Sequence, residues 1–194
     1  MKKKTGMLYI LAITLVISML GSLVTPRPVQ AAETVLSIDW YRTALSGTGL
    51  TDVCQGAEVI VAVNVSDVQN LYGYSLTLLF DPDAITVVDV FNAGWLSEDF
   101  PILDFFDNTT GVIKYDMTQM NPSLAVSGPG TLIYISLIVE DTTKALDFTI
   151  NTTRDYANDL QPTILADNNG DPISYTVGDT SGPVGRDCDV FVPI

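Results

Sequence analysis

Residues 58–65 read Glu-Val-Ile-Val-Ala-Val-Asn-Val, and residues 72–80 read Tyr-Gly-Tyr-Ser-Leu-Thr-Leu-Leu-Phe. In both stretches large apolar side chains return at every second position, which is the period of a β-strand that buries one face. The second stretch places Leu76, Leu78 and Phe80 on the same side, and we expect these three side chains to lie in the core. Each stretch therefore predicts a strand of a β-sheet with one apolar face.

Seven more runs have the composition of strands, being rich in Val, Ile, Thr, Tyr and Phe. Clusters of Asp, Asn, Gly and Pro separate them, as turn residues do. No stretch after residue 31 keeps a helical period, and about nine strands at this spacing predict an all-β fold, a β-sandwich in one domain. The seven runs are Ile85–Phe91, Val112–Thr118, Thr131–Glu140, Leu146–Asn151, Thr163–Ala166, Ile173–Val177 and Val190–Ile194.

The N-terminal residues have the layout of a signal peptide. Three lysines at positions 2–4 precede an uncharged apolar run, Met7–Val24, and Ala31 offers a small residue before a cleavage position. We expect residues 1–31 to be removed on export and residues 32–194 to form the secreted domain. An uncleaved membrane anchor is the alternative, because the apolar run approaches the length of a bilayer span. The rest of the chain shows no second apolar span.

The chain is strongly acidic, with a net charge of −14, and it contains no histidine. Four of its nine basic residues lie within the first 27 positions, so the expected secreted domain is more acidic still. Such a surface repels nucleic acid and anionic lipid and favours cationic partners. We therefore expect neither a nucleic acid nor a membrane as a partner of this domain.

Two cysteines occur, Cys54 and Cys188. In an exported protein a single pair predicts one disulfide, and two free buried thiols are the alternative. Because a bridge between them would enclose most of the domain, the chain-entropy model gives it about 4–5 kcal/mol of stabilisation.

The sequence offers few candidates for catalysis. The absence of histidine excludes Ser-His and Cys-His mechanisms and metal clusters with imidazole ligands. Pairs of carboxylates could serve a glycosidase, but none stands in a recognisable motif. We expect no enzyme, no catalytic residue, no metal site and no cofactor.

Two features of the sequence are candidate ligand sites, one for calcium and one for sugars. The run Asp167–Asp171 has oxygen ligands for calcium, but its Asn169-Gly170 pair lies between two short strands and favours a hairpin. A flat sugar platform needs exposed aromatic rings on one strand face, whereas the polar side of residues 73–79 carries no ring. Trp95 is flanked by apolar residues and is expected in the core, and Trp40 and Tyr41 could be exposed.

Several pieces of the chain, in order, resemble the cohesin domain family and, less specifically, its carbohydrate-binding neighbours. They extend from about Val35 to Val177, most of the expected domain. The pieces are Val63-Asn-Val-Ser-Asp-Val-Gln-Asn-Leu-Tyr-Gly-Tyr74, Leu79-Phe-Asp-Pro82, Ile85-Thr-Val-Val-Asp-Val90, Phe106-Asp-Asn-Thr-Thr-Gly-Val-Ile113, Ser127-Gly-Pro-Gly-Thr-Leu132 and Asp167-Asn-Asn-Gly-Asp-Pro-Ile173.

The resemblance implies a nine-stranded jelly-roll sandwich whose first and last strands lie side by side, which would bring Cys54 near Cys188. It also implies a partner, a dockerin-type protein module that carries its own calcium. In the family the dockerin binds one flat sheet face. The residues that match this face, or neighbour it with their side chains outward, are Gly73, Ser75, Thr77, Lys114, Asp116 and Thr118.

Two segments depart from the family pattern, Tyr41–Val53 and Gly178–Ile194. Neither carries a family motif, so both leave the choice of partner open. The sequence predicts an extracellular, non-catalytic cohesin-like module that binds a dockerin-bearing protein in polysaccharide degradation. Direct carbohydrate binding by the same sandwich is the alternative, so a polysaccharide remains a second possible partner.

Overall fold

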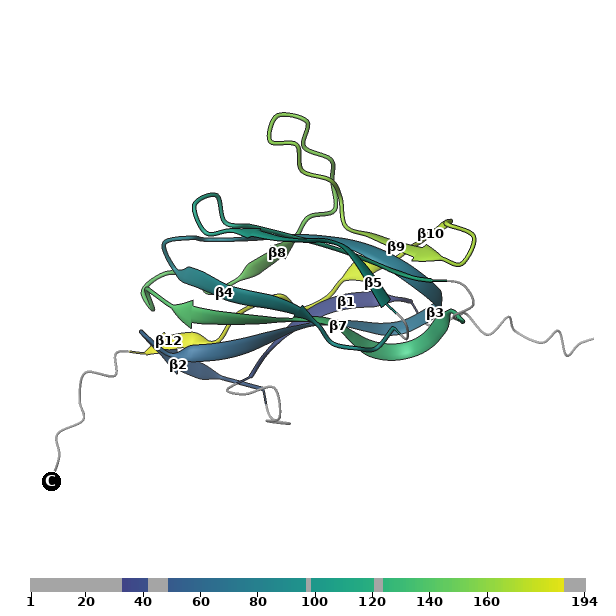
Figure 1. Ribbon diagram of the computed structural model, residues 1–194. Coiled ribbons are helices and arrows are strands. Elements are labelled where there is room, and N and C mark those ends of the chain that lie inside the picture. Colours follow the sequence, from purple (N-terminus) through teal and green to yellow (C-terminus); the bar gives the residue numbers. More distant parts are fainter. Residues whose placement is uncertain (1–32, 42–48, 97–98, 121–123, 187–194) are drawn as a thin grey trace, which may run out of the picture. The chain divides into compact units, whose positions relative to one another are not determined.

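The computed structural model describes residues 33–41, 49–96, 99–120 and 124–186, and every regular element within these ranges is a β-strand (Figure 1). The described residues belong to one compact unit that begins at Glu33. The strands are β1 (Val35–Tyr41), β2 (Asp52–Cys54), β3 (Glu58–Phe80), β4 (Ile85–Asn92), β5 (Asp99–Asp107), β6 (Val112–Gln119), β7 (Val126–Val139), β8 (Phe148–Ile150), β9 (Ile164–Asp167), β10 (Pro172–Ile173), β11 (Thr176–Val177) and β12 (Val184–Arg186).

The long strand β3 joins the two layers of the fold. Its first half pairs with β1 and β7, and its second half pairs with β6, β8 and β9. Between the halves the pairing with β7 shifts at three places, and Asp67 and Asn70 have φ of 49° and 58°. Such bulges and left-handed residues bend a strand sharply. The two strands predicted at 58–65 and 72–80 are therefore one strand that changes layer.

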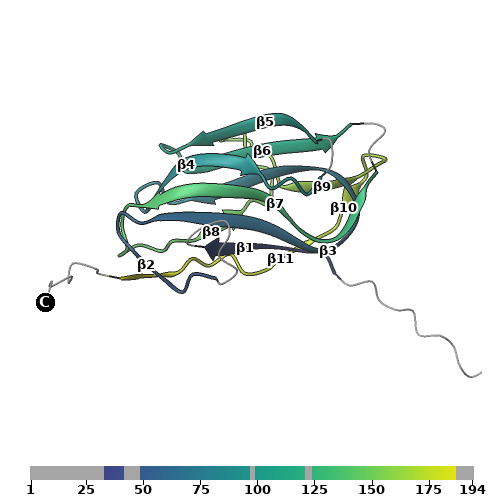
Figure 2. The same ribbon diagram turned by 60° about the horizontal axis from the view of Figure 1, so that its bottom comes forward.

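Two sheets result. One has the order β11–β1–β3–β7–β4. The other has the order β5–β6–β3–β9–β10, with β8 beside β3 next to β9. Figure 2 shows β5 beside β6 at one margin of the strands. In the described ranges no helix is long and apolar enough to cross a membrane.

The core lies between the sheets and confirms the predicted faces. Leu76 and Leu78 are fully buried and Phe80 nearly so, and they face the valines of the first half of β3. Phe148 of β8 bridges the layers, with its ring 5.7 Å from that of Trp40 and 5.8 Å from that of Phe80. Trp40 is thus buried, and the suggestion that it could be exposed is wrong.

Strand β5 was missed by the sequence analysis. Its residues, Asp-Phe-Pro-Ile-Leu-Asp-Phe-Phe-Asp, show no period of two. The structure gives the reason, because β5 pairs only with β6 and its register shifts between Pro101 and Leu103. Proline and bulges are tolerated at sheet edges. Strand β1 was also unassigned, although Leu36, Ile38 and Trp40 alternate there with partly exposed residues.

The ends of the domain meet where the disulfide is expected. Strand β12 pairs in parallel with β2, and Arg186 lies opposite Cys54. Arg186 also forms an ion pair with Asp52, with 3.0 Å between Nη2 and Oδ2. Cys188 follows two residues later but lies outside the described residues, as do the expected signal peptide and the expected strand Val190–Ile194. The disulfide therefore stays a prediction.

We expect the intact mass of the alkylated, non-reduced chain to show no alkylated thiol, because β12 ends at Arg186, which lies opposite Cys54 and precedes Cys188 by two residues in the sequence. Replacing either cysteine by serine should lower the free energy of unfolding by about 2–5 kcal/mol. Two alkylated thiols on the folded monomer would contradict the prediction.

Aspartates close many of the turns. In six of them the backbone N–H two residues later donates to the aspartate carboxylate at 2.7–3.0 Å. Hydrogen bonds from the residues that follow lower the pKa of each of these carboxyls. Part of the acidic composition is thus explained by turn geometry. The six are Asp81, Asp107, Asp141, Asp155, Asp167 and Asp179.

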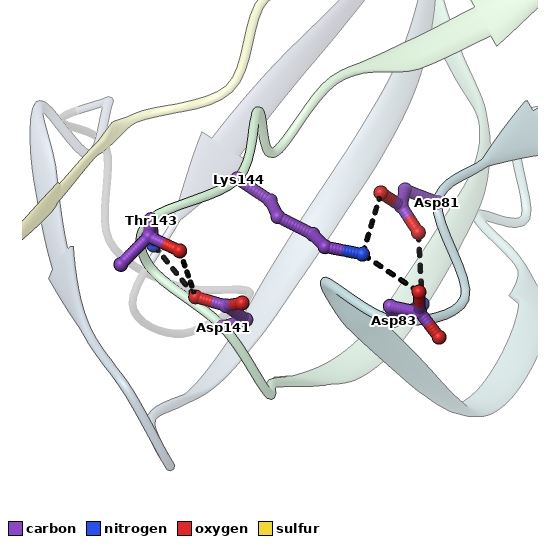
Figure 3. Close-up of polar contacts among 5 residues, drawn as sticks. All are labelled: Asp81, Asp83, Asp141, Thr143 and Lys144. Atoms are coloured by element: carbon purple, nitrogen blue, oxygen red, sulfur yellow. Dashed lines mark hydrogen bonds and ion pairs between the residues drawn. The ribbon is translucent and has the colours of Figure 1, made fainter.

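Lys144 links two of these turns (Figure 3). Its Nζ lies 2.7 Å from Asp83 Oδ2 and 3.3 Å from Asp81 Oδ2, in the turn after β3, while Lys144 itself follows β7. The hydrogen bond to Asp83 raises the pKa of Lys144. Because these groups are exposed, the ion pairs add little to stability.

We expect Asp107→Ala to make the fold less stable at neutral pH and this difference to shrink in acid. The N–H of Thr109 and the hydroxyl of Thr110 lower the pKa of Asp107 below its ordinary 3.8. A carboxyl with a lowered folded-state pKa stabilises the fold above the unfolded pKa and loses this effect as the pH falls through the folded value. Urea unfolding of the parent and the variant, at pH 7 and at decreasing pH below 3.8, measures the difference in their free energies of unfolding. An unchanged difference across that range would contradict it.

Candidate protein-binding face

The outer face of the second sheet is built in rows across β9, β3, β6 and β5. Directly opposite residues of antiparallel strands project to the same side. Because Tyr74, Leu76 and Leu78 point into the core, their neighbours on β3 must point outward. The register gives one row of Ala166, Gly73, Thr118 and Phe100, a second of Ile164, Ser75, Asp116 and Leu103, and a third of Thr77, Lys114 and Phe105.

The margins of this face are apolar and its centre is polar. Phe100 and Phe105 on β5 are 54% and 45% exposed, and Ile164 on β9 is 42% exposed. Between these margins Ser75 and Asp116 are half-buried. Large exposed apolar side chains grouped on one face mark interaction surfaces, and Phe100, Leu103 and Phe105 form such a group along β5. The apolar margin on β5 was missed by the sequence analysis, because β5 itself was missed.

Four of the six predicted face residues are accessible, and two are not. Ser75, Lys114, Asp116 and Thr118 are half-buried on the outer face. Gly73 is buried, and a Cβ there would lie 3.0 Å from the carbonyl oxygen of Met117. Thr77 is only 1% exposed, so the expectation of an exposed Thr77 at the centre of the face is wrong.

The strand beside Thr77 is interrupted at this residue. Strand β8 pairs with β3 up to Leu78, and β9 resumes the pairing at Ser75. In the gap the hydroxyl of Thr163 accepts from the Thr77 N–H at 3.0 Å and donates to the Thr77 carbonyl at 3.2 Å. The same carbonyl accepts from the N–H of Asn151 at 2.9 Å. Thr163 and Asn151 thus satisfy the backbone of Thr77 and close the base of the segment that connects β8 to β9.

We call residues 151–163 the flap. It stands out from the sheets beside β8 and β9 (Figure 1). Its two arms are joined by backbone hydrogen bonds of 2.9 Å in both directions between Asp155 and Leu160. The Nζ of Lys114 on the outer face donates to the carbonyl oxygen of Asp159 at 3.1 Å. The amine of Lys114 is therefore engaged by the flap.

A pocket of about 430 Å³ lies between the flap and the strands β3 and β6. Leu79 and Val112 are directly opposite each other and, by alternation, form the fourth row of the outer face. The pocket therefore continues the face. Its lining is completed by Phe80, Thr110 and Gly111 and by Asp155, Asn158 and Leu160 of the flap.

The tryptophans do not form a sugar platform. Trp40 is in the core, and Trp95 is partly buried against it, as expected. A Cβ on Gly130 would lie 2.1 Å from the Trp95 ring, so the ring packs directly on that glycine. Tyr41 is half-buried, and burial followed by the charge of Asp39 raises its pKa.

The Asp167–Asp171 segment forms the predicted hairpin between β9 and β10. Gly170 has φ of 82°, and Asp167 Oδ1 accepts from the N–H groups of Asn169 and Asp171 at 2.8 and 2.9 Å. Within the part of the chain that the structure describes, no three acidic or cysteine side chains converge as metal ligands would.

The family model described as the cohesin domain matches residues 48–172 of the chain. Among solved structures, the chain is similar to a type II cohesin in a cohesin–X–dockerin complex from Acetivibrio cellulolyticus (12% identity, TM-score 0.61, 79% of this chain and 100% of that chain). It is also similar to the third cohesin ScaC of that organism, in complex with the ScaB dockerin (20% identity, TM-score 0.56, 79% of this chain and 99% of that chain). A third similar structure is a non-cellulosomal cohesin from the archaeon Archaeoglobus fulgidus (20% identity, TM-score 0.52, 77% of this chain and 89% of that chain). A search of curated proteins finds no match.

These structural likenesses, together with the strand register, define a jelly-roll β-sandwich. Because the family model covers more than half of its length, the chain belongs to the cohesin domain family. The fold and the family expected from the sequence are thus confirmed.

We expect Thr163→Val to lower the free energy of unfolding by about 1–3 kcal/mol, because the buried N–H of Thr77 would lose its partner. The amide of Thr77 should also exchange with solvent faster. Urea unfolding and hydrogen exchange measure the two effects. Thr149→Val, on the exposed side of β8, is the matched control and should change stability by less than about 0.5 kcal/mol. Equal stability of the two variants would show that the base of the flap does not depend on this hydroxyl.

Proposed function

We propose that the chain is an extracellular, non-catalytic module that binds a dockerin-bearing protein through the outer face of β9, β3, β6 and β5. The observation that carries the proposal is the composition of this face, with apolar side chains at both margins and small or polar ones between. Small residues such as Ser75 leave the centre flat enough for a helix to lie across it. Membership of the cohesin family supports the choice of a dockerin as the partner, since solved cohesins similar to this chain are in complex with dockerins.

The charges of the face favour a partner with basic groups. The amine of Lys114 is held by the flap, whereas the carboxylate of Asp116 lies half-buried in the middle row. A lysine or arginine of the partner beside Asp116 would donate a charge-assisted hydrogen bond to its carboxylate. A stable protein interface buries about 800 Å² on each partner, so we expect both margins of the face to take part.

The sequence supports export, because residues 1–31 have the layout of a signal peptide. The proposed role is to hold a dockerin-bearing protein of polysaccharide degradation outside the cell. We place the calcium of the complex on the dockerin and none on this chain. The strand at the centre of the face, residues 73–79, presents no ring outward, which favours a protein over a polysaccharide as its ligand.

We expect Ser75→Arg to weaken dockerin binding at least about tenfold, or about 1.4 kcal/mol. The long side chain would fill the centre of the face and neutralise Asp116, which lies directly opposite. Ser75 is a better probe of the face than Thr77, because arginine at the buried Thr77 would disturb the fold. Calorimetric titration with calcium-loaded dockerin modules from the same organism gives the affinity.

The matched control is Ser136→Arg, because Ser136 is half-buried on β7, in the other sheet. Its affinity should equal that of the parent, and both variants should keep the parent's melting temperature within a few degrees. Damage by Ser136→Arg with none by Ser75→Arg would place the binding site on the other sheet. Binding of insoluble polysaccharide by the parent, with no affinity for any dockerin, would favour the carbohydrate-binding alternative.

A further inference from the structure

The flap adds a structure that the sheet itself does not require. Strand β8 ends at Ile150 and β9 begins at Ile164, so a short turn could have kept the pairing with β3 unbroken. Instead the chain leaves the sheet over residues 151–163, and buried hydrogen bonds close the base of this excursion around Thr77. A segment built out in this way, on the edge of a candidate interface, is a candidate for recognition.

The tip of the flap is held in one conformation by its own hydrogen bonds. The carboxylate of Asp155 accepts from the N–H of Ala157 at 2.9 Å and from the side-chain amide of Asn158 at 2.7 Å. Asp159, with φ of 52°, turns its carbonyl oxygen to Lys114 on the outer face. The flap is therefore attached to the face by a side chain of the face itself.

This conformation presents an aromatic ring to solvent. Tyr156 is 82% exposed, and the guanidinium of Arg154 lies 4.8 Å from the centre of its ring. The guanidinium covers one side of the ring and restricts its orientation before any partner arrives. Tyrosine and arginine, with tryptophan, are enriched among the side chains that anchor protein interfaces. Tyrosine in particular buries a large area at a small loss of conformational freedom.

The pocket beside the flap is lined on the sheet side by Leu79 and Val112. Asp155, which directly precedes Tyr156 in the sequence, also lines it. Hydrogen bonds from Asn158 and Ala157 lower the pKa of Asp155, so its carboxyl is ionised at neutral pH. A pocket with aliphatic side chains and one carboxylate in its lining suits an aliphatic side chain that stands next to a lysine or arginine.

We propose that the flap is a second contact for the same protein partner: an aliphatic side chain of the partner enters the pocket on Leu79 and Val112, a neighbouring basic side chain meets Asp155, and Tyr156 packs against the partner's surface. This inference rests on the proposed function, because the pocket continues the outer face by one row. The flap would then decide among partners that the flat face alone binds alike. Discrimination would come from the end of the partner that reaches the pocket, and mainly from its dissociation rate.

The test compares three variants of the purified chain by surface plasmon resonance, on a panel of calcium-loaded dockerin modules from the same organism. Tyr156→Ala should weaken binding about tenfold for the tightest dockerin, chiefly through faster dissociation. Tyr156→Phe keeps the ring and should stay within about twofold of the parent. Val88→Ala is the matched control, because Val88 is also exposed but belongs to β4 in the other sheet, and its affinity should equal that of the parent.

The outcomes separate this inference from the proposed function. If Ser75→Arg weakens binding and Tyr156→Ala does not, the flap is no part of the interface and the inference is overturned, while the proposed function stands. If Tyr156→Ala weakens binding of all dockerins equally, the flap is a contact but the claim that it discriminates is overturned. If the parent binds no dockerin, the proposed function fails and this inference fails with it. Since Tyr156 is exposed, we expect the melting temperature of Tyr156→Ala to equal that of the parent.

Discussion

The rest of the structure depends on the bend in β3. One strand supplies the centre of both sheets, so the register of each sheet with its neighbours is set by the same stretch of chain. The bend at Asp67 and Asn70 turns the valines of the first half and the leucines of the second half toward each other. Once these faces meet, the pleat alone decides that Ser75 and Asp116 point outward.

The second constraint is that every buried backbone group of this strand needs a partner. Where β8 leaves β3, the N–H and carbonyl of Thr77 would be unpaired, and the Thr163 hydroxyl and the Asn151 N–H replace the missing strand. These replacement hydrogen bonds allow the flap to leave the sheet between β8 and β9 while the N–H and carbonyl of Thr77 stay paired.

Strand β5 shows how an edge can carry apolar side chains. An exposed, flat and apolar edge invites pairing with other chains. In β5 the proline at position 101 lacks an N–H, and the register shift next to it breaks the regular edge. The side chains of Phe100 and Phe105 nevertheless remain on the outer face, opposite Thr118 and Lys114. Pairing with a foreign strand is thus hindered, while the face stays available to a partner that lies across it.

The sequence alone determined the strand character of β3, the buried side of its two halves and the hairpin at Asn169-Gly170. These depend on local periodicity and on turn chemistry, both of which are written in neighbouring residues. The resemblance of ordered motifs added the family and the central strands of the outer face. Ser75 and Asp116 could therefore be named before their partners in space were known.

Only the tertiary structure decided that Thr77 is covered, that Phe100 and Phe105 join the face, and that the flap with Tyr156 stands beside it. Alternation tells which side of a sheet a residue takes, but burial depends on what packs over that side. For Thr77 the residues that take the place of the missing neighbouring strand lie more than 70 positions further along the chain. For β5 the register shift between Pro101 and Leu103 breaks the alternation of apolar and polar residues by which a strand is recognised in a sequence.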